Sequence, residues 1–176
     1  AAATFTATSD STVTTYLWGD NGSGGLQTTT GTTSGIYSVL VTDNNGCTGR
    51  DTGSLRVNAL PVISVNNDTI CVGDPAATFT ATSDTAVTTY LWGDNGSGGL
   101  ATTSGTTAGL YSVTITDVNG CIGKDTGLLV VNAIPIIKVN DSAICAGDPV
   151  AMFTAVSDSA VTTYLWGDNG SGGTQT

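Results

Sequence analysis

The sequence predicts an all-β protein built of tandem antiparallel β-sandwich repeats. The chain is rich in Thr, Val, Ser, Gly and Asn, contains no Glu, and has few Lys, Gln, Arg and Met residues. The string VTTYLWGDNGSGG occurs three times, beginning at Val13, Val87 and Val161, so the period is 74 residues. Short alternating segments are separated by turns of Gly, Asn and Asp, which is typical of a sandwich. Together these features predict a rod-like array.

Landmarks outside the repeated string keep the same spacing. They are Phe5, Phe79 and Phe153; Tyr37 and Tyr111; Cys47 and Cys121; and Cys71 and Cys145. This alignment predicts a partial first repeat at 1–60, a complete repeat at 61–134 and a partial third repeat at 135–176. The first repeat lacks the first strand and first cysteine of the complete one. We expect either that the sequence is part of a longer array or that neighbouring chains complete the partial repeats.

The complete repeat opens with two predicted strands. PVISV at 61–65 is short and largely apolar. ATFTATS at 77–83 alternates, which places Phe79 and Ala81 on one face of the strand.

The repeated string supplies a strand and a turn. TTYLW at 88–92 places Tyr90 and Trp92 on one face. GDNGSGG at 93–99 predicts a turn, because Gly and Asn tolerate positive φ. LATTSGT at 100–106 predicts a weak strand.

The last part of the repeat carries the strongest alternation. GLYSVTITD at 109–117 predicts a strand, VNGC at 118–121 a turn, and GLLVVN at 127–132 the closing strand. The side chains expected to point inward are Tyr111, Val113 and Ile115.

These residues resemble a known family. GDPAATFTA, YLWGDNGSGG and GLYSVTITDVNGC are similar to the immunoglobulin-like and PKD-like repeats of secreted and surface proteins of the Bacteroidota, including gliding-motility adhesins. The resemblance covers the whole chain. It implies immunoglobulin-like sandwiches and a bacterial extracellular or cell-surface location, and it implies no particular ligand.

The four cysteines predict disulfides. There is no His and no CxxC pair, so a zinc site and an activated catalytic thiol are both disfavoured. The gap between Trp92 and Tyr111 most easily holds one strand, which would bring Cys71 and Cys121 to the same end of the repeat. Such a Cys71–Cys121 bond closes roughly 50 residues and would stabilise the fold by up to about 4 kcal/mol. The alternative pairs Cys47 with Cys71, and Cys121 with Cys145.

The charge excludes several partners. The formal net charge is −10, with only four Lys and Arg residues, which argues against binding nucleic acid or an anionic membrane surface. No apolar run is long enough to span a membrane. Because there is no His, no Glu and no nucleophile beside a base, we expect no enzymatic activity and no cofactor.

Calcium binding is a less favoured hypothesis than a glycine-rich turn. The GDNGSGG loop offers one carboxylate, Asp94, whereas calcium loops normally offer several. Junctions between repeats offer Asp74, Asp117 and Asp125. The favoured interpretation is a glycine-rich turn and no metal. Likewise, Trp18, Trp92 and Trp166 are expected to fill the core rather than form an aromatic binding platform.

Glycosylation is a more specific hypothesis than calcium binding. Asp-Ser and Asp-Thr triplets resemble the O-glycosylation signal of secreted Bacteroidota proteins, with acceptors in predicted turns at Ser11, Thr69, Thr85, Ser142 and Ser159. N-x-[ST] sequons, a less favoured signal here, occur at Asn21, Asn67, Asn95, Asn140 and Asn169.

The sequence therefore predicts a structural subunit or segment of an extracellular filament or adhesin stalk. We expect it to be braced by disulfides, to carry covalent glycans and to self-associate or form a continuous array. The alternatives are a multivalent glycan- or surface-binding module and a non-catalytic spacer of a larger secreted protein. A recognition array should vary its loops, whereas this loop is identical in all three copies.

Overall fold

The computed structural model describes residues 2–167, which form only strands, turns and extended segments. The described residues divide into two compact units, residues 2–61 with 118–121 and residues 62–117 with 122–167. The described residues contain no helix, so they include no helix that is long and apolar enough to cross a membrane.

The second repeat is a β-sandwich of two sheets. One sheet has the order β10-β8-β6 and the other the order β7-β12-β11-β9. The strands are β6 (Ile63–Val65), β7 (Asp68–Cys71), β8 (Ala77–Ser83), β9 (Val87–Asp94), β10 (Thr102–Gly105), β11 (Gly109–Asp117) and β12 (Ile122–Asn132). All pairs are antiparallel except β7 with β12, which is parallel. The predicted all-β sandwich is confirmed for this repeat.

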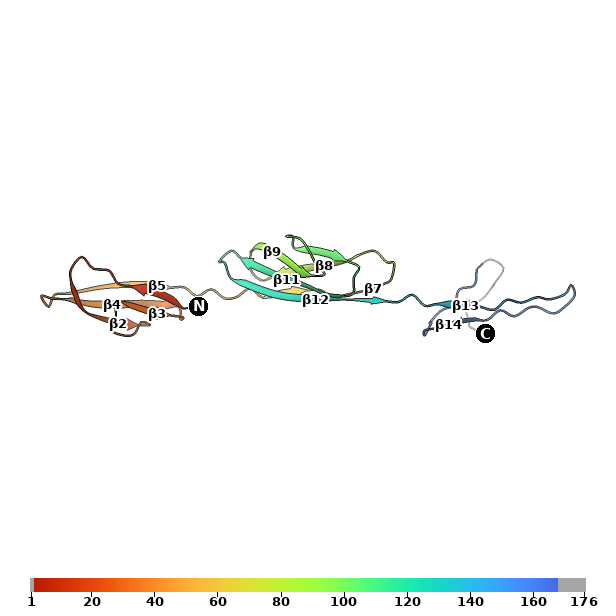
Figure 1. Cartoon of the computed structure of the whole chain (residues 1–176), viewed down its shortest axis with the longest axis horizontal. Coiled ribbons are helices and arrows are strands. Elements are labelled where there is room, and N and C mark those ends of the chain that lie inside the picture. Colours follow the sequence, from red (N-terminus) through yellow and green to blue (C-terminus); the bar gives the residue numbers. More distant parts are fainter. Residues whose placement is uncertain (1, 168–176) are drawn as a thin grey trace. The chain divides into compact units, whose positions relative to one another are not determined.

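The chain enters this sandwich at one end and leaves it at the other. Val65 donates its amide to Asp125 of β12, and Asn67 accepts the amide of Leu128. Residues 68–71 then pair in parallel with residues 129–132. The β6–β7 segment therefore runs alongside β12 in the same direction. We call the end where β12 begins the leading end and the end where β12 finishes the trailing end (Figure 1).

Inward-facing apolar side chains of both sheets form the core. Phe79 of β8 stacks on Tyr111 of β11 with ring centroids 4.1 Å apart, and both side chains are fully buried. Val113, Ile115 and Leu129 surround them. The alternation predicted for 77–83 and 109–117 is therefore confirmed.

The β7 strand was not predicted, and β12 is longer than the closing strand predicted at 127–132. NNDTIC, residues 66–71, contains little apolar alternation, so β7 owes its extended conformation to pairing with β12. The first half of β12 lies opposite β11 in a continuous register that local sequence does not reveal.

The first repeat contains the counterparts of β8 to β12 only. β1 pairs with β3, and β4 lies between β2 and β5. The strands are β1 (Ala3–Thr6), β2 (Val13–Asp20), β3 (Thr28–Gly31), β4 (Gly35–Asp43) and β5 (Thr48–Leu55). Phe5 stacks on Tyr37 with centroids 4.4 Å apart, as the equivalent pair does in the second repeat.

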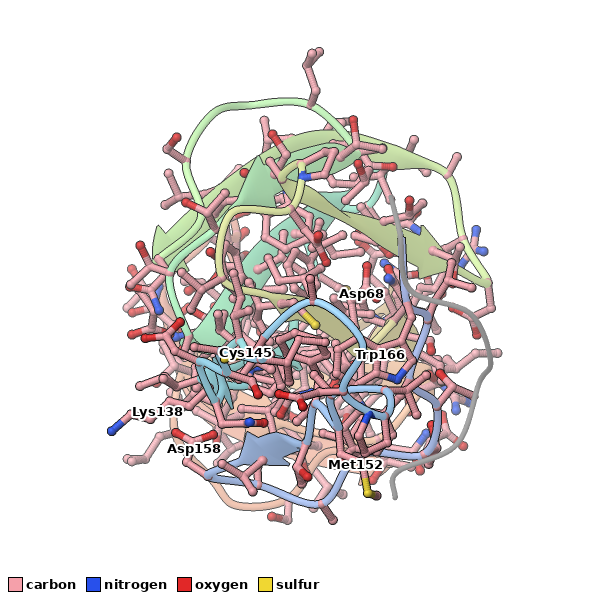
Figure 2. The ribbon with its side chains drawn as sticks, turned by 90° about the vertical axis from the view of Figure 1, so that its right-hand side faces the viewer. Asp68, Lys138, Cys145, Met152, Asp158 and Trp166 are labelled. Atoms are coloured by element: carbon pink, nitrogen blue, oxygen red, sulfur yellow. The ribbon has the colours of Figure 1, made fainter. Side chains whose placement is uncertain are left out.

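The third repeat shows one strand pair within the described residues. β13 (Ile137–Val139) pairs antiparallel with β14 (Ala155–Ser157). Lys138 projects outward from β13 (Figure 2).

Candidate functional site

The GDNGSGG loop is held tightly against the core. In the second repeat the Trp92 indole N–H donates to the Leu100 carbonyl at 2.8 Å, and the Thr103 hydroxyl bonds both the amide and the carbonyl of Ser97. The first repeat repeats these bonds, with Trp18 donating to Leu26 at 2.8 Å. Any side chain at Gly96 would crowd Trp92. These contacts make the loop a packing element, as expected of a glycine turn.

The same loop reverses the chain inside the repeat. Asp94 has φ of 55° and Gly98 φ of 101°, and the loop folds back so that the Trp92 amide donates to the Gly98 carbonyl at 3.4 Å. As a result, β9 and β10 run in the same direction, and so do β8 and β11. A Cys71–Cys121 bond at one end of the repeat would require the opposite, with β11 antiparallel to β8.

This reversal makes the predicted Cys71–Cys121 disulfide wrong. Cys71 ends β7 opposite Asn132, the last residue of β12, whereas Cys121 immediately precedes β12. Eleven residues of strand separate them, or roughly 35 Å at about 3.3 Å per residue. A disulfide needs Cα atoms within about 7 Å. Cys71 lies at the trailing end and Cys121 at the leading end.

Any disulfide made by Cys71 or Cys121 would therefore need a partner outside the complete repeat. The alternative pairing, Cys47 with Cys71 and Cys121 with Cys145, stays a prediction. It requires residues 62–67 to fold back on the preceding repeat, whereas β6 pairs with β8 of its own repeat. Cys47, Cys71 and Cys145 are exposed, which leaves their thiols accessible to such partners.

The aspartates proposed for calcium are not assembled into a site. Asp74 accepts the amide of Cys71 at 2.8 Å, and Asp125 accepts the amide of Val65 at 2.8 Å. Asp117 is buried, and Asp94 lies exposed in the loop. Within residues 2–167, no group of three or more His, Cys, Asp or Glu side chains gathers where a metal ion could bind.

Asp43 organises the β4–β5 turn. Its carboxylate accepts the amides of Cys47 at 2.8 Å and Asn45 at 2.9 Å. The Cys47 hydrogen bond, joined by those of Asn45 and Gly46, lowers the pKa of Asp43 below the ordinary value of 3.8. This carboxylate is therefore a structural acceptor.

The hydroxyls predicted to carry O-glycans are accessible to different degrees. Ser11, Ser142 and Ser159 are exposed, and Thr85 is half-buried in the β8–β9 turn, where it bonds Ser83. Thr69 is exposed but lies within β7, so its predicted turn position is wrong.

In the described part of the chain, the asparagine side chains of the sequons make hydrogen bonds that support the fold. Asn67 accepts the Leu128 amide at 2.7 Å, and Asn140 bonds Met152 and Thr154. Asn21 and Asn95 donate to carbonyls across their loops. Asn169 lies outside the described residues.

The aromatic residues of the first two repeats belong to the core, as predicted. Trp18 and Trp92 are buried, while Trp166 is half-buried. The buried Tyr111 donates its hydroxyl to the Thr107 carbonyl at 3.1 Å. Gly105 must lack a side chain, because any Cβ there would overlap the Tyr111 hydroxyl.

One concave feature of the first repeat is an open groove between its two sheets. It has a volume of about 430 Å³. Apolar side chains on its floor include Phe5, Trp18, Tyr37, Val39 and Val41.

Polar groups form the rim of this groove. Asp10, Arg50 and Asp51 are among them. The corresponding space in the second repeat contains β6, whose Val65 packs in the core.

Sequence reasoning missed the residues that fix β6 in place. Asn66 bonds the Thr78 carbonyl at 3.0 Å and the Thr80 amide at 2.7 Å, and Asp125 holds Val65. The recurrence of Asn66 as Asn140 at the repeat period was a signal that could have identified this contact.

Comparisons with known proteins identify no family. No protein-family model matches the chain, and no curated protein matches it. Among solved structures, the chain is similar to one described as the Bacteroides ovatus mixed-linkage glucan utilization locus SGBP-B in complex with mixed-linkage heptasaccharide. The two are 14% identical with a TM-score of 0.22, and the match covers 85% of this chain and 46% of that one. The chain thus spans less than half of the length of that structure, and at this TM-score the likeness carries no functional conclusion.

Proposed function

We propose that the chain is a structural segment of an extracellular filament or adhesin stalk built of tandem sandwich repeats. The observation that carries the proposal is the path of the chain through the second repeat. Because β6 and β12 run in the same direction, the chain enters at the leading end and leaves at the trailing end. Repeats connected in this way extend an array instead of folding back on it.

The connecting segments support the same role. NALPV at 58–62 and NAIPI at 132–136 are short and contain proline, which restricts φ. A stalk assembled through such linkers would be semi-rigid.

The repeated string supports a scaffold because its conserved contacts serve packing. The Trp92 and Thr103 contacts recur in the first repeat with the same partners and lengths within a few tenths of an ångström. Identity of the loop therefore preserves the fold of the first and second copies.

Surface modification and covalent bracing complete the proposal. O-glycans on the exposed hydroxyls Ser11, Ser142 and Ser159 would hydrate a surface with few charges. Disulfides would link each cysteine to a partner outside its own repeat. Both modifications fit an oxidising, extracellular bacterial location.

Small-angle X-ray scattering on chains of two, three and four complete repeats tests the proposal. The maximum dimension should grow by a constant step per repeat of roughly 40–45 Å, set by the part of β12 beyond Asp125 together with the linker to β13. A dimension that stops growing would show that repeats fold back on one another and would refute the stalk. The intact mass of protein from the native source should exceed the mass of the polypeptide by the mass of whole sugar residues. A mass equal to that of the polypeptide alone would refute glycosylation.

A further inference from the structure

The aspartate of the repeated loop differs from most other aspartates of the chain. The carboxylates of Asp43, Asp84 and Asp125 accept backbone amides and so hold turns and strands in place. Asp20 and Asp94, the first two copies of the loop aspartate, are exposed. Their carboxylates accept no hydrogen bond and form no ion pair within residues 2–167. The packing of the loop therefore does not use them.

These two loop aspartates also hold an uncommon backbone conformation. The angle φ is 56° at Asp20 and 55° at Asp94, and no other non-glycine residue in the described part of the chain has a positive φ. Glycine would adopt this conformation without the steric cost of a Cβ atom. A strained residue that turns its carboxylate to solvent is suited to binding a group outside its own repeat.

The basic residues show a matching pattern. The chain has four Lys and Arg residues, and two of them, Arg50 and Lys124, occupy the same position at the 74-residue period. Arg50 lies on β5 and Lys124 on β12, and both are exposed. Neither forms an ion pair with another described residue. The first and second repeats therefore each present one carboxylate and one cation that have no intramolecular partner among the described residues.

Arg50 borders a depression on the outer face of the β2-β4-β5 sheet. The depression has a volume of about 330 Å³ and is lined by Leu17, Trp18, Gly19, Ser38, Leu40 and Arg50. Leu40 lies between Leu17 and Arg50 on neighbouring strands. Gly19 lies opposite Ser38, and a Cβ atom at Gly19 would come within 3.1 Å of the Ser38 hydroxyl oxygen. The missing side chain at Gly19 thus keeps the depression open.

The second repeat has the same arrangement on its four-stranded sheet. Gly93 lies opposite Ser112, and Thr114 lies between Leu91 and Lys124. Neither β6 nor β7 forms part of this arrangement, because β6 belongs to the other sheet and β7 pairs with the opposite edge of β12. The arrangement therefore does not depend on how completely a repeat is closed by these two strands.

The charge of this sheet face is complementary to the loop. Strand alternation turns the aspartates of β11 and β12 away from it, since Asp117 is buried and Asp125 bonds to Val65 of the other sheet. In a chain with a formal net charge of −10, a face with a cation and with its aspartates turned inward is where a second acidic copy meets least repulsion. The cation also attracts a carboxylate.

We propose that the loop aspartate of one copy, Asp20 or Asp94, forms an ion pair with Arg50 or Lys124 on the sheet face of a second copy. A second copy fits as the partner because each repeat that contains both elements supplies one of each charge. The contact joins two different surfaces, so it can continue from copy to copy. The inference goes beyond the stalk proposed above, because it concerns contacts between copies and not the connection of repeats within one.

Exposed leucines accompany both charges. Leu26 and Leu100 directly follow the loop and are each 73% exposed, while Leu17 and Leu91 beside the cations are 64% and 68% exposed. Contact between these leucines would remove apolar surface from water and strengthen the neighbouring ion pair. Because a single exposed ion pair stabilises little, firm association requires several repeats to engage together.

Cross-linking with a carbodiimide identifies the contact. The reagent activates a carboxylate, and a lysine amine then displaces the activating group, which leaves an amide bond between the two side chains. Isotopically labelled and unlabelled full chains are mixed under reducing conditions, cross-linked and analysed by mass spectrometry. We expect peptides of mixed isotope that join Lys124 to Asp20 or Asp94. No cross-link at Lys124, or links confined to one isotope, would overturn the proposal.

Paired variants test the cations. Arg50→Ser combined with Lys124→Ser should lower the self-association constant measured by sedimentation about tenfold, because two exposed ion pairs are lost. Arg56→Ser combined with Lys138→Ser is the matched control, since it removes the same charge and leaves the depression intact. The control should associate like the unmodified chain. An equal loss in both variants would show an effect of net charge alone and would overturn the contact.

Neutralising the loop carboxylates separates the contact from net charge more sharply. The variant combines Asp20→Asn and Asp94→Asn with Asp168→Asn, which lies outside the described residues, and Asn tolerates positive φ. It reduces the negative charge, so general repulsion would make it associate more strongly. The proposed contact predicts association about tenfold weaker. Asp141→Asn, at an exposed aspartate outside the loop, is the control and should not weaken association.

Mixing distinguishes a lost surface from a misfolded chain. The cation variant keeps its loop aspartates and the asparagine variant keeps its cations, so an equimolar mixture should associate more strongly than either variant alone. A mixture that does not regain association would overturn the proposal, as would an unmodified chain that stays monomeric. Heparin binding at Lys124 without association of copies would assign the face to an anionic polysaccharide and would also overturn it. None of these results would alter the stepwise growth in length expected of the stalk.

Discussion

The first and second repeats share their aromatic core and their loop but differ in how completely that core is covered. Phe79 is 0% exposed, while its counterpart Phe5 is half-buried. Leu129 and Leu55 differ in the same way. The second repeat has β6 and β7 over this region, and the first does not. The comparison shows that these two short strands complete the burial of Phe79 and Leu129, which the alternating strands alone leave partly exposed in the first repeat.

The largest expected difference in stability is between variants of Phe79 and Phe5, each of which stacks on a tyrosine. Phe79→Ala should destabilise the second repeat by about 3–5 kcal/mol, since it removes a fully buried ring and leaves a cavity. Phe5→Ala should cost the first repeat about half as much, because that ring already contacts solvent. Urea denaturation read by hydrogen-exchange mass spectrometry resolves the two repeats. Equal losses would contradict the difference in coverage.

The next largest effect concerns a pair of glycines. Gly127→Ala should destabilise the second repeat by roughly 1–3 kcal/mol, because its methyl group would overlap the Asn66 carbonyl. Gly53→Ala should cost the first repeat clearly less, since its methyl group meets only the edge of the Phe5 ring, at 3.0 Å. Thermal unfolding of both variants measures the difference, and a larger loss from Gly53→Ala would reverse the interpretation.

A smaller effect on stability is expected at the aspartates Asp125 and Asp51, which occupy equivalent positions in the two repeats. Asp125→Ala should cost about 1 kcal/mol because it leaves the Val65 amide without its acceptor. Asp51→Ala should have almost no effect on the isolated chain, since Asp51 is exposed and accepts only the adjacent Thr52 amide among the described residues. Denaturation midpoints compare the two variants. If Asp51→Ala is the more destabilising, Asp51 already holds a strand.

The smallest effect concerns pH and the β4–β5 turn. Since the folded pKa of Asp43 is lowered, its contribution is present above the ordinary value of 3.8 and is lost as the pH falls through the lower folded value. The Cys47 amide resonance should therefore titrate with a midpoint below 3.8. The Asp43→Asn variant should lack this transition, and a midpoint at or above 3.8 would contradict the hydrogen-bonded turn.

The sequence was sufficient for the parts of the fold that depend on local pattern. Alternation located β8 and β11 and the inward residues Phe79, Tyr111 and Val113. The period correctly predicted that Trp18 and Trp92 have equivalent core positions.

Strand direction could not be predicted, because it depends on how the loop folds. Gly98 lets the loop return along β9, and that extra reversal changes the relative direction of β8 and β11. The predicted cysteine pairing depended on this direction and was wrong for that reason. β7 was missed because its extended conformation comes from a partner about 60 residues away in the sequence.

Hydrogen exchange on the dilute, reduced chain tests the central comparison most directly. Residues 129–132 of β12 pair with β7, whereas the equivalent residues 55–58 have no such strand beside them in the described part of the chain. We expect strong protection at 129–132 and little at 55–58. Equal protection of the two segments would contradict the account, because it would show that pairing with β7 is not what protects residues 129–132.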